Sequence, residues 1–325
     1  MKLPLISIIV PVYNTGETVV KLLNQLMQDS YENLEIICVD DGSKDDSFSL
    51  LSEFCRQQKL KGSNKKIMLL QQENAGPAAA RNTGLEKMHG ELVAFIDSDD
   101  AVSKNYLSEM CKLLLKEKVA VVTSGFLYKR IHQKTKKEMF TEKIPEREKG
   151  EDFKTYVLKN LAKDGRLYAS VNKMFRTDVI LKHELKFPTG WDFAEDTNFV
   201  LQYLKCAEKD GFDQLKFLAK PYYIYHYGTE TSTVASSSLP WKNWQKSFNF
   251  LLKWIGKNPT KEQRYWLMRV MIRWRISHAL AVARSNQKIT EKWNLHNHKF
   301  QKLFPTTQAV ASFLEHYLYS TQYQQ

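Results

Sequence analysis

The sequence has no long hydrophobic run. Its 325 residues contain no stretch near the roughly 20 consecutive apolar residues that a membrane-spanning helix needs. The apolar run after Lys2 lacks the small-residue cleavage site of a signal peptide before Glu17, so we expect a first strand over residues 5–12 instead. Apolar residues make up 43% and charged residues 26%, which is ordinary globular usage. These features predict a soluble protein.

Cysteine is scarce and scattered. Cys38, Cys55, Cys111 and Cys206 lie far apart, and no C-x-x-C pair occurs. This spacing excludes the paired cysteines of common zinc and dithiol redox sites. A reducing, cytoplasmic location is therefore expected.

Several common catalytic signatures are also missing. No two glycines stand two residues apart, which excludes the G-x-G-x-x-G dinucleotide motif. The motifs G-K-[ST], H-E-x-x-H and G-x-S-x-G do not occur either. P-loop, zinc-protease and serine-hydrolase functions therefore have no support.

The first 125 residues alternate short β-branched runs with segments of helical spacing. Helical spacing appears at Val19, Leu22, Leu23 and Leu26, and Pro77 stands where a first-turn proline is favoured. Ser103 is a predicted helix cap. The strand-like runs are residues 5–12, 34–40, 66–72, 91–97 and 119–125. This alternation predicts an α/β fold with a mostly parallel central sheet flanked by helices.

Acidic residues cluster after the fourth predicted strand, in the segment DSDD at 97–100. An EF-hand loop beginning at Asp97 is excluded, because Val102 and Ser108 stand where Gly and Glu are required. Helix capping would use one acid, Asp100. In an extended segment Asp97 and Asp99 project to the same side, so the pair suits a hard cation such as Mg²⁺ or Mn²⁺.

Two other segments contain candidate site residues. One follows a predicted strand, and the other begins a predicted helix. Asp40 and Asp41 in VDDGS either form a turn or accept hydrogen bonds from a base or ribose. Arg81 either pairs with a phosphate, which its planar guanidinium suits, or is a surface residue of a helix. Because ligands bind beyond the carboxyl ends of strands in open α/β sheets, PVYN, VDDGS and IDSDD are expected to face one crevice.

Taken in order, five segments over about residues 5–235 resemble a bacterial family 2 glycosyltransferase of the GT-A fold. They are PVYN at 11–14, DDGS at 40–43, NAGPAAARNTGL at 74–85, DSDD at 97–100 and ED at 195–196. The resemblance implies a nucleotide-sugar donor and inversion at the anomeric carbon.

The resemblance also implies a role for each matching residue. Asp40 would accept a hydrogen bond from the nucleotide base, and Asp97 and Asp99 would bridge the ribose, the metal and the diphosphate. His226 is either a third metal ligand or a packed histidine among tyrosines. The remaining predicted substrate contacts are Pro11, Val12, Tyr13, Asn14, Asn74, Arg81 and Ser98.

The ED pair is the implied source of the catalytic base. Asp196 is the matching member, and Glu195 is next to it. The same acids also suit the first turn of the helix that follows, and the two interpretations are compatible. Trp191, just ahead of the pair, either stacks on a sugar ring or packs in the core.

The last 85 residues differ in composition from the rest. From Trp241 onward there are 14 Lys and Arg against three acids, whereas the formal charge of the whole chain is +12. Trp244, Phe248, Leu251 and Ile255 continue a helical spacing from Trp241, and a second helix is predicted over 262–284. We place a domain boundary near residue 240, between a catalytic domain (1–240) and a basic helical region (241–325). This region would serve homo-oligomerisation, contact with a membrane surface, or binding of an anionic polymer.

The charged segment 126–150 is predicted to be a solvated hairpin or loop without chemistry. The overall prediction is a transferase that uses Mn²⁺ or Mg²⁺ to move a hexosyl or N-acetylhexosaminyl group from a nucleotide sugar, most simply a UDP-sugar. The acceptor would be a hydroxyl of a glycan, lipid-linked or teichoic-type molecule in cell-surface polysaccharide synthesis.

Two alternatives remain. A nucleotidyltransferase would need a Gly-rich, basic loop after the first strand, and PVYNTGETVV has none. The other is a non-catalytic nucleic-acid or polyanion binder, although nucleic acid is not an expected partner.

Overall fold

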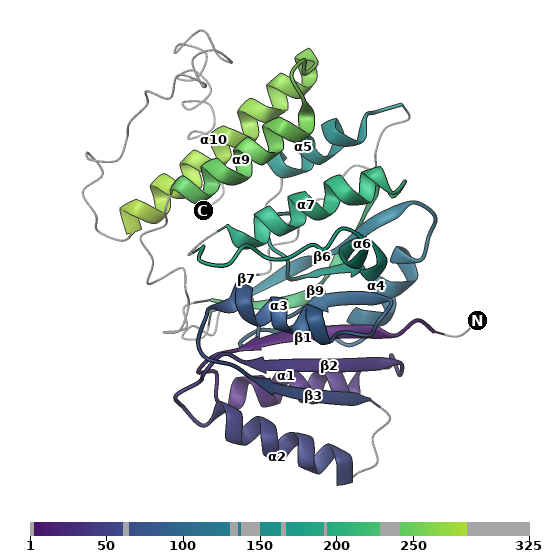
Figure 1. The fold of residues 1–325 in the computed structure, drawn as a ribbon, viewed down its shortest axis with the longest axis vertical. Coiled ribbons are helices and arrows are strands. Elements are labelled where there is room, and N and C mark those ends of the chain that lie inside the picture. Colours follow the sequence, from purple (N-terminus) through teal and green to yellow (C-terminus); the bar gives the residue numbers. More distant parts are fainter. Residues whose placement is uncertain are drawn as a thin grey trace. The chain divides into compact units, whose positions relative to one another are not determined.

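The computed structural model describes residues 3–60, 65–130, 136–137, 150–163, 167–191, 194–227 and 241–284 (Figure 1). The chain divides into a compact unit, Met1–Arg275, and a second unit, Ile276–Gln325. Of the second unit, only the helical segment that ends at Arg284 is described. The elements below belong to the first unit unless stated otherwise.

A nine-stranded mixed sheet forms the centre of the first unit, with the order β3-β2-β1-β4-β8-β6-β9-β5 and with β7 paired to β6. The strands β3, β2, β1 and β4 are mutually parallel, as are β6 and β9, whereas β8, β5 and β7 pair antiparallel. Their bounds are β1 Ile6–Val12, β2 Leu34–Asp40, β3 Lys66–Gln71, β4 Leu92–Phe95, β5 Ala101–Val102, β6 Val119–Arg130, β7 Lys136–Lys137, β8 Lys173–Arg176 and β9 Gln214–Tyr227. The prediction of a mostly parallel sheet is confirmed.

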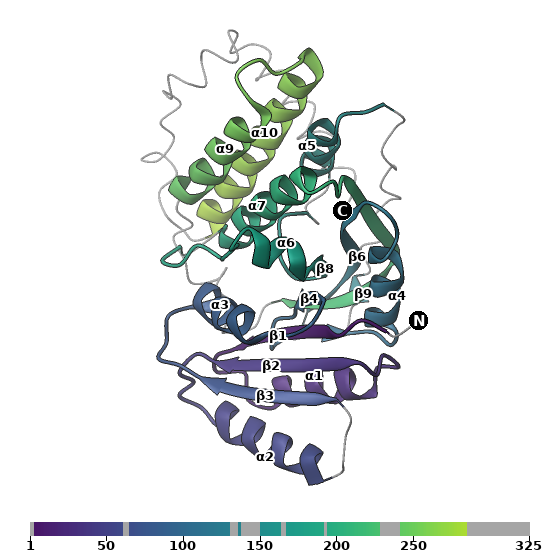
Figure 2. The ribbon, with the colours of Figure 1, turned by 45° about the vertical axis from the view of Figure 1, so that its right-hand side comes forward.

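Helices cover both faces of this sheet, as Figures 1 and 2 show. The core under one face joins the strands to α1, α2 and α4, and the core under the other face joins them to α3, α5, α6, α7, α9 and the first part of α10. The bounds are α1 Glu17–Gln28, α2 Ser47–Leu60, α3 Pro77–Lys87, α4 Tyr106–Leu114, α5 Phe153–Lys163, α6 Thr177–Lys182, α7 Glu195–Lys209, α9 Trp241–Ile255 and α10 Lys261–Arg284. The sheet is therefore buried on both sides, which explains the continuous apolar runs of its strands.

Strand β1 shows how the two cores are divided. Ile8 and Val10 point into the core with α1, whereas Ile9 points into the core with α3, because successive side chains of a strand alternate between faces. Helix α3 comes very close to the strand at Gly84, where an added Cβ would lie 2.4 Å from Cγ2 of Ile9. A residue larger than glycine would push α3 away from the loops that β1 and β4 carry.

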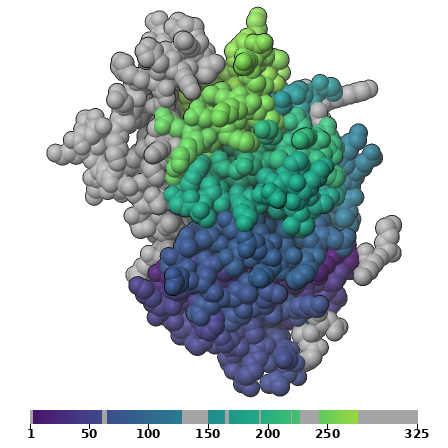
Figure 3. Space-filling model, in the orientation of Figure 1, coloured from purple at the N-terminus to yellow at the C-terminus, as the bar shows by residue number. Residues whose placement is uncertain are grey.

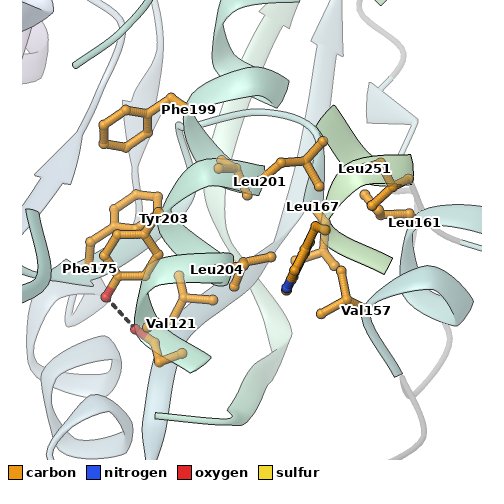
Figure 4. Close-up of a cluster of buried hydrophobic side chains, with 14 of the residues drawn as sticks. Val121, Val157, Leu161, Leu167, Phe175, Phe199, Leu201, Tyr203, Leu204 and Leu251 are labelled. Carbon is orange, nitrogen blue, oxygen red and sulfur yellow. Dashed lines mark hydrogen bonds between the residues drawn. The ribbon is translucent and has the colours of Figure 1, made fainter. Parts of the chain in front are cut away.

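The larger core surrounds α7 (Figure 4). Leu201 and Leu204 of α7 pack there with Leu161 of α5 and Leu251 of α9. The buried Tyr203 hydroxyl donates to the carbonyl of Ala120 at 2.7 Å, so its polar end is satisfied inside the core. This packing fixes the position of α7, and α7 begins at the predicted catalytic pair.

Two local predictions near DSDD were wrong. The helix α4 begins after Asn105, which has φ 68°, and Ser103 contributes its backbone carbonyl to the Tyr106 N–H at 3.2 Å rather than a side-chain cap. Asp100 does not cap a helix either, since it binds Tyr223 and His226. The reason is the short strand β5, which pairs with β9 directly after Asp100 and delays the start of the helix.

The charged segment 126–150 extends the sheet further than a loop would. Strand β6 continues to Arg130 because it pairs with β9, and β7 returns beside it as the predicted hairpin. Residues 131–135 and 138–149 lie outside the described residues.

The predicted helices after residue 240 are present. Trp244 and Leu251 of α9 are buried in the core of α7. None of the described helices combines the length and the apolar character that crossing a bilayer would require. The domain boundary at residue 240 stays a prediction.

Candidate active site

The loops after β1, β2 and β4 meet at one edge of the sheet, because these strands are adjacent and parallel. Pro11 and Val12 are buried at the end of β1. Tyr13 begins the first loop and is 40% exposed. Asn14 has φ 50°, and its amide oxygen accepts from the backbone N–H of Lys44 at 2.7 Å. The amide oxygen of Asn14 therefore ties the first loop to the second, and its role as a substrate contact stays a prediction.

The second loop uses its two aspartates differently. Asp41 accepts from the backbone N–H groups of Ala75 and Gly76 at 2.9 and 2.8 Å, so it anchors the loop that leads to α3. Asp40 is fully buried and accepts from the Ser43 N–H through Oδ2, but its Oδ1 has no hydrogen-bond partner among the described residues. A buried carboxylate oxygen without a donor is costly unless a ligand supplies one.

Arg81 of α3 lies at the centre of the site. Its side chain is only 4% exposed, and its guanidinium lies 2.8 Å from Asp97, 3.3 Å from Asp196 and 3.6 Å from Glu195. Burial alone would lower the pKa of Arg81, but the charges of Asp196, Asp97 and Glu195 outweigh it and raise the pKa. One buried cation therefore joins the DSDD turn to the ED pair, which are almost 100 residues apart in the sequence.

Glu195 and Asp196 open α7 after Ala194, whose φ is 66°. Burial raises the pKa of Glu195 to about 7, the charge of Asp196 adds to this, and Arg81 opposes it. Asp196 is somewhat more exposed, at 22% against 16% for Glu195, and Oδ1 of Asp196 accepts from the Ser170 hydroxyl at 2.8 Å. Asp196 is thus held in orientation by a neutral donor and a cation.

The other end of the DSDD turn is held by β9. The Tyr223 hydroxyl donates to Asp100 at 2.7 Å and accepts from the Asp97 N–H at 3.2 Å, and the His226 N–H donates to Asp100 at 2.9 Å. Burial raises the pKa of Asp99 to about 6, with a further contribution from the charge of Asp97. Burial and the charges of Asp97 and Asp99 raise the pKa of Asp100 strongly.

His226 has a defined orientation beside these acids. Its Nδ1 lies 2.7 Å from the carbonyl oxygen of Asp99. Because a carbonyl oxygen only accepts, Nδ1 carries the proton and Nε2 keeps a lone pair. An imidazole nitrogen with a lone pair is the kind that binds a metal ion.

Within the part of the chain that the structure describes, no three His, Cys, Asp or Glu side chains converge as a metal-binding cluster. The predicted ligands Asp97, Asp99 and His226 therefore do not form a complete set of protein ligands. Their donor types nevertheless fit a divalent ion that takes its other ligands from water and a diphosphate, because hard cations prefer carboxylate oxygens.

The other predicted substrate-contact residues have different surroundings. Asn74 is exposed on the loop after β3, and Ser98 is buried between Asp97 and Asp99. Trp191 lies against α9, where the ammonium of Lys246 is 4.6 Å from the centre of its indole ring. No local pattern points to Ser170 or to the role of Tyr223, because each contacts a partner far away in the chain.

The comparisons with known proteins agree with this geometry. The model of the family "Glycosyl transferase family 2" matches residues 7–183. A putative glycosyltransferase, EpsH of Bacillus subtilis, is 32% identical over 72% of this chain and 63% of its own length. The aligned part covers less than two thirds of each of the first curated relatives.

Solved structures with a similar fold include complexes with nucleotide sugars. The TarS 1–349 structure from S. aureus in complex with UDP-GlcNAc has a TM-score of 0.63 and 21% identity, covering 83% of this chain and 72% of that one. The mannosyltransferase PcManGT from Pyrobaculum calidifontis, in complex with GDP-Man and Mn²⁺, has a TM-score of 0.55 and 16% identity, covering 89% and 77%. The fold is thus of the GT-A type, and with more than half of its residues matched by the family model, the chain belongs to glycosyl transferase family 2.

Proposed function

We propose that this protein is a metal-dependent, inverting glycosyltransferase that moves a hexosyl or N-acetylhexosaminyl group from a UDP-sugar to a hydroxyl of a glycan acceptor. The main observation that supports this proposal is the buried guanidinium of Arg81, which contacts both Asp97 and Asp196. It places the segment that would meet the donor diphosphate beside the carboxylate that would act as base. Both halves of a transfer reaction therefore lie around one side chain.

The nucleotide base would bind between Tyr13 and Asp40. Tyr13 offers an exposed aromatic ring for stacking, and the unpartnered Oδ1 of Asp40 would accept from an N–H of the base. Uracil carries such an N–H on its pairing edge. Because Asp40 is fully buried, this hydrogen bond would satisfy an oxygen that has no partner within the described part of the chain.

Asp196 would act as the general base. It would take the proton of the acceptor hydroxyl while that oxygen bonds to the anomeric carbon and the nucleoside diphosphate leaves from the opposite side, which inverts the centre. The Ser170 hydroxyl and Arg81 hold Asp196 in place for this step. Glu195 is the second candidate, and its pKa of about 7 is suited to exchanging a proton near neutral pH.

Asp97, Asp99 and Nε2 of His226 would hold the metal. When bound, Mn²⁺ or Mg²⁺ would neutralise charge on the departing diphosphate. Proteins of similar structure have been solved with such molecules: TarS with UDP-GlcNAc, and PcManGT with GDP-Man and Mn²⁺. The similarity to the putative glycosyltransferase EpsH supports glycosyl transfer, and a role in cell-surface polysaccharide synthesis is a further part of this proposal.

The test measures UDP binding by calorimetry with Mn²⁺ and with EDTA. We expect binding to require the metal and the Asp99→Asn variant to lose this requirement together with most of the affinity, because a charged metal ligand is removed. Asp178→Asn is the matched control, since Asp178 follows β8 at the opposite edge of the sheet, where Arg176 pairs with Leu92 at the start of β4. Equally tight UDP binding in EDTA would contradict the proposed metal site, and no UDP binding under either condition would contradict the proposed donor.

A further inference from the structure

A groove of about 400 Å³ lies between α7 and α9 and is separate from the carboxylate cluster. Trp191, Asn198 and Gln202 line it on one side, and Lys246, Asn249, Phe250 and Lys253 line it on the other. Figure 3 shows the surfaces of these two helices in contact, α7 in teal and α9 in light green. Resting on the function proposed above, we propose that this groove binds the acceptor and that the acceptor is an acidic glycan.

One side of the groove is formed by the helix that begins at the proposed catalytic pair. Asn198 and Gln202 stand three and seven residues after Glu195 on α7, so all three lie on one face of the helix. At 1.5 Å of rise per residue this face extends about 10 Å from Glu195 to Gln202. Trp191 precedes the same helix end and lines the same groove. A chain lying in the groove would therefore present its end to Glu195 and Asp196.

The α9 side of the groove is formed by residues on one face of that helix. Lys246, Asn249, Phe250 and Lys253 follow the spacing of three, four and seven residues that places side chains on one helix face. The opposite face of α9, with Trp244 and Leu251, is used for packing in the core. The groove face of α9 is therefore not used in the packing that holds α9 on α7.

The chemistry of the lining suits sugars. Trp191 and Phe250 contribute aromatic rings, and the side-chain amides of Gln202 and Asn249 offer donors and acceptors for hydroxyl groups. Asn198 is buried, and its amide oxygen orients Gln202 by accepting from it at 2.6 Å. A flat lipid surface would not need carboxamides set between two helices. The lining therefore favours a saccharide chain over a membrane.

The charge of the lining favours an acidic chain. Lys246 and Lys253 line the groove, and Lys205 adds a third ammonium 5.3 Å from the Phe250 ring. No acid occurs among the described lining residues, and Glu208 at the far end is already bonded to the Trp254 indole at 2.8 Å. Phosphate or carboxylate groups on the acceptor would supply the missing negative charge.

The test measures binding of the full chain, without donor, to hyaluronan oligosaccharides and to poly(glycerol phosphate) oligomers, with neutral chitooligosaccharides for comparison. We expect at least one acidic probe to bind more tightly than the neutral one and to weaken as salt rises. The Lys246→Gln/Lys253→Gln variant should bind it about 2- to 30-fold more weakly, the range for two exposed ion pairs. Trp191→Ala should weaken it about 2- to 10-fold through lost ring contact.

The matched control is Lys209→Gln/Lys257→Gln, which removes the same charge from exposed positions at the ends of α7 and α9. Equal weakening in both double variants would reduce the effect to net charge and overturn the groove. Binding of neither acidic probe would also overturn it, as would lysine-dependent binding to phosphatidylglycerol vesicles alone. UDP binding in the same preparations separates this from the proposed function: protein that binds UDP but no acidic glycan fails only the groove.

Discussion

The two ends of the DSDD turn hold their negative charge in different ways. At one end, Asp97 shares the guanidinium of Arg81 with Glu195 and Asp196. At the other end, the Asp100 carboxylate accepts from the Tyr223 hydroxyl and the His226 backbone N–H, and Asp99 contacts the His226 ring only through its backbone carbonyl. Among the residues described by the structure, no Lys or Arg forms an ion pair with either of these two acids.

This difference shows where the protein compensates its own charge and where it does not. The Arg81 end sets one cation against three acids inside the fold, so it compensates part of its negative charge without a ligand. The Tyr223 end keeps two acids whose pKa values are raised by burial and by neighbouring carboxylates. Such an arrangement is costly in the empty protein and becomes favourable when a cation binds, a common trade between stability and function.

The largest expected effect comes from removing the charge of the proposed base at the Arg81 end. Asp196→Asn should lower sugar transfer by about 10²- to 10⁴-fold, the usual contribution of a positioned general base. UDP binding should stay near that of the unchanged protein, because Asp97 and Asp40 are untouched. The measurement is transfer rate and UDP affinity on the same preparation. Parallel loss of both would make Asp196 a donor contact, and full activity would move the base to Glu195.

The next effect concerns the cation itself. Arg81→Gln should reduce the free energy of unfolding by about 3–5 kcal/mol, because breaking a buried ion cluster leaves uncompensated charges inside. The control is Arg56→Gln, which removes an exposed arginine paired with Glu53 on α2 and should change stability far less. Urea unfolding of the two variants gives the comparison. Similar losses in both would mean that the Arg81 cluster does not stabilise the fold.

The smallest effect is the pH dependence of Glu195. Its pKa is raised from 4.5 to about 7 in the folded protein, so between these values the folded state keeps a proton that the unfolded chain has released. The stability that this group contributes is present below pH 4.5 and is lost as the pH rises towards 7. Glu195→Gln should flatten this decline by on the order of 1 kcal/mol, because the amide does not titrate.

The measurement is urea unfolding of both proteins across this pH range without metal. Asp99 and Asp100 titrate in the same direction in both proteins, so the difference between the two curves isolates Glu195. Parallel curves would show that Arg81 keeps Glu195 ionised in the folded protein.

The sequence by itself determined the elements and the order of the motifs. Alternating β-branched runs and helical spacings predicted β1 to β4, β6, α1 and α3 close to their observed bounds, because burial on one face imposes a period that is visible locally. The same patterns placed DDGS and DSDD at strand ends, since the turn residues follow the apolar runs directly. The family resemblance rested on these local features and is confirmed by the match over residues 7–183.

Tertiary structure alone decided what each of these residues contacts. It gave Asp40 and Asp41 different roles. Asp40 has a buried oxygen without a hydrogen-bond partner among the described residues, whereas Asp41 anchors the next loop. It moved the start of α4 beyond Ser103 through the pairing of β5 with β9, and it joined Tyr223 to Asp100 across 123 positions of the chain. The groove between α7 and α9 likewise exists only because two helices with separate stripes pack together. The physical reason is that periodicity records which side of an element is buried, whereas hydrogen bonds and ion pairs depend on which distant element comes to lie against it.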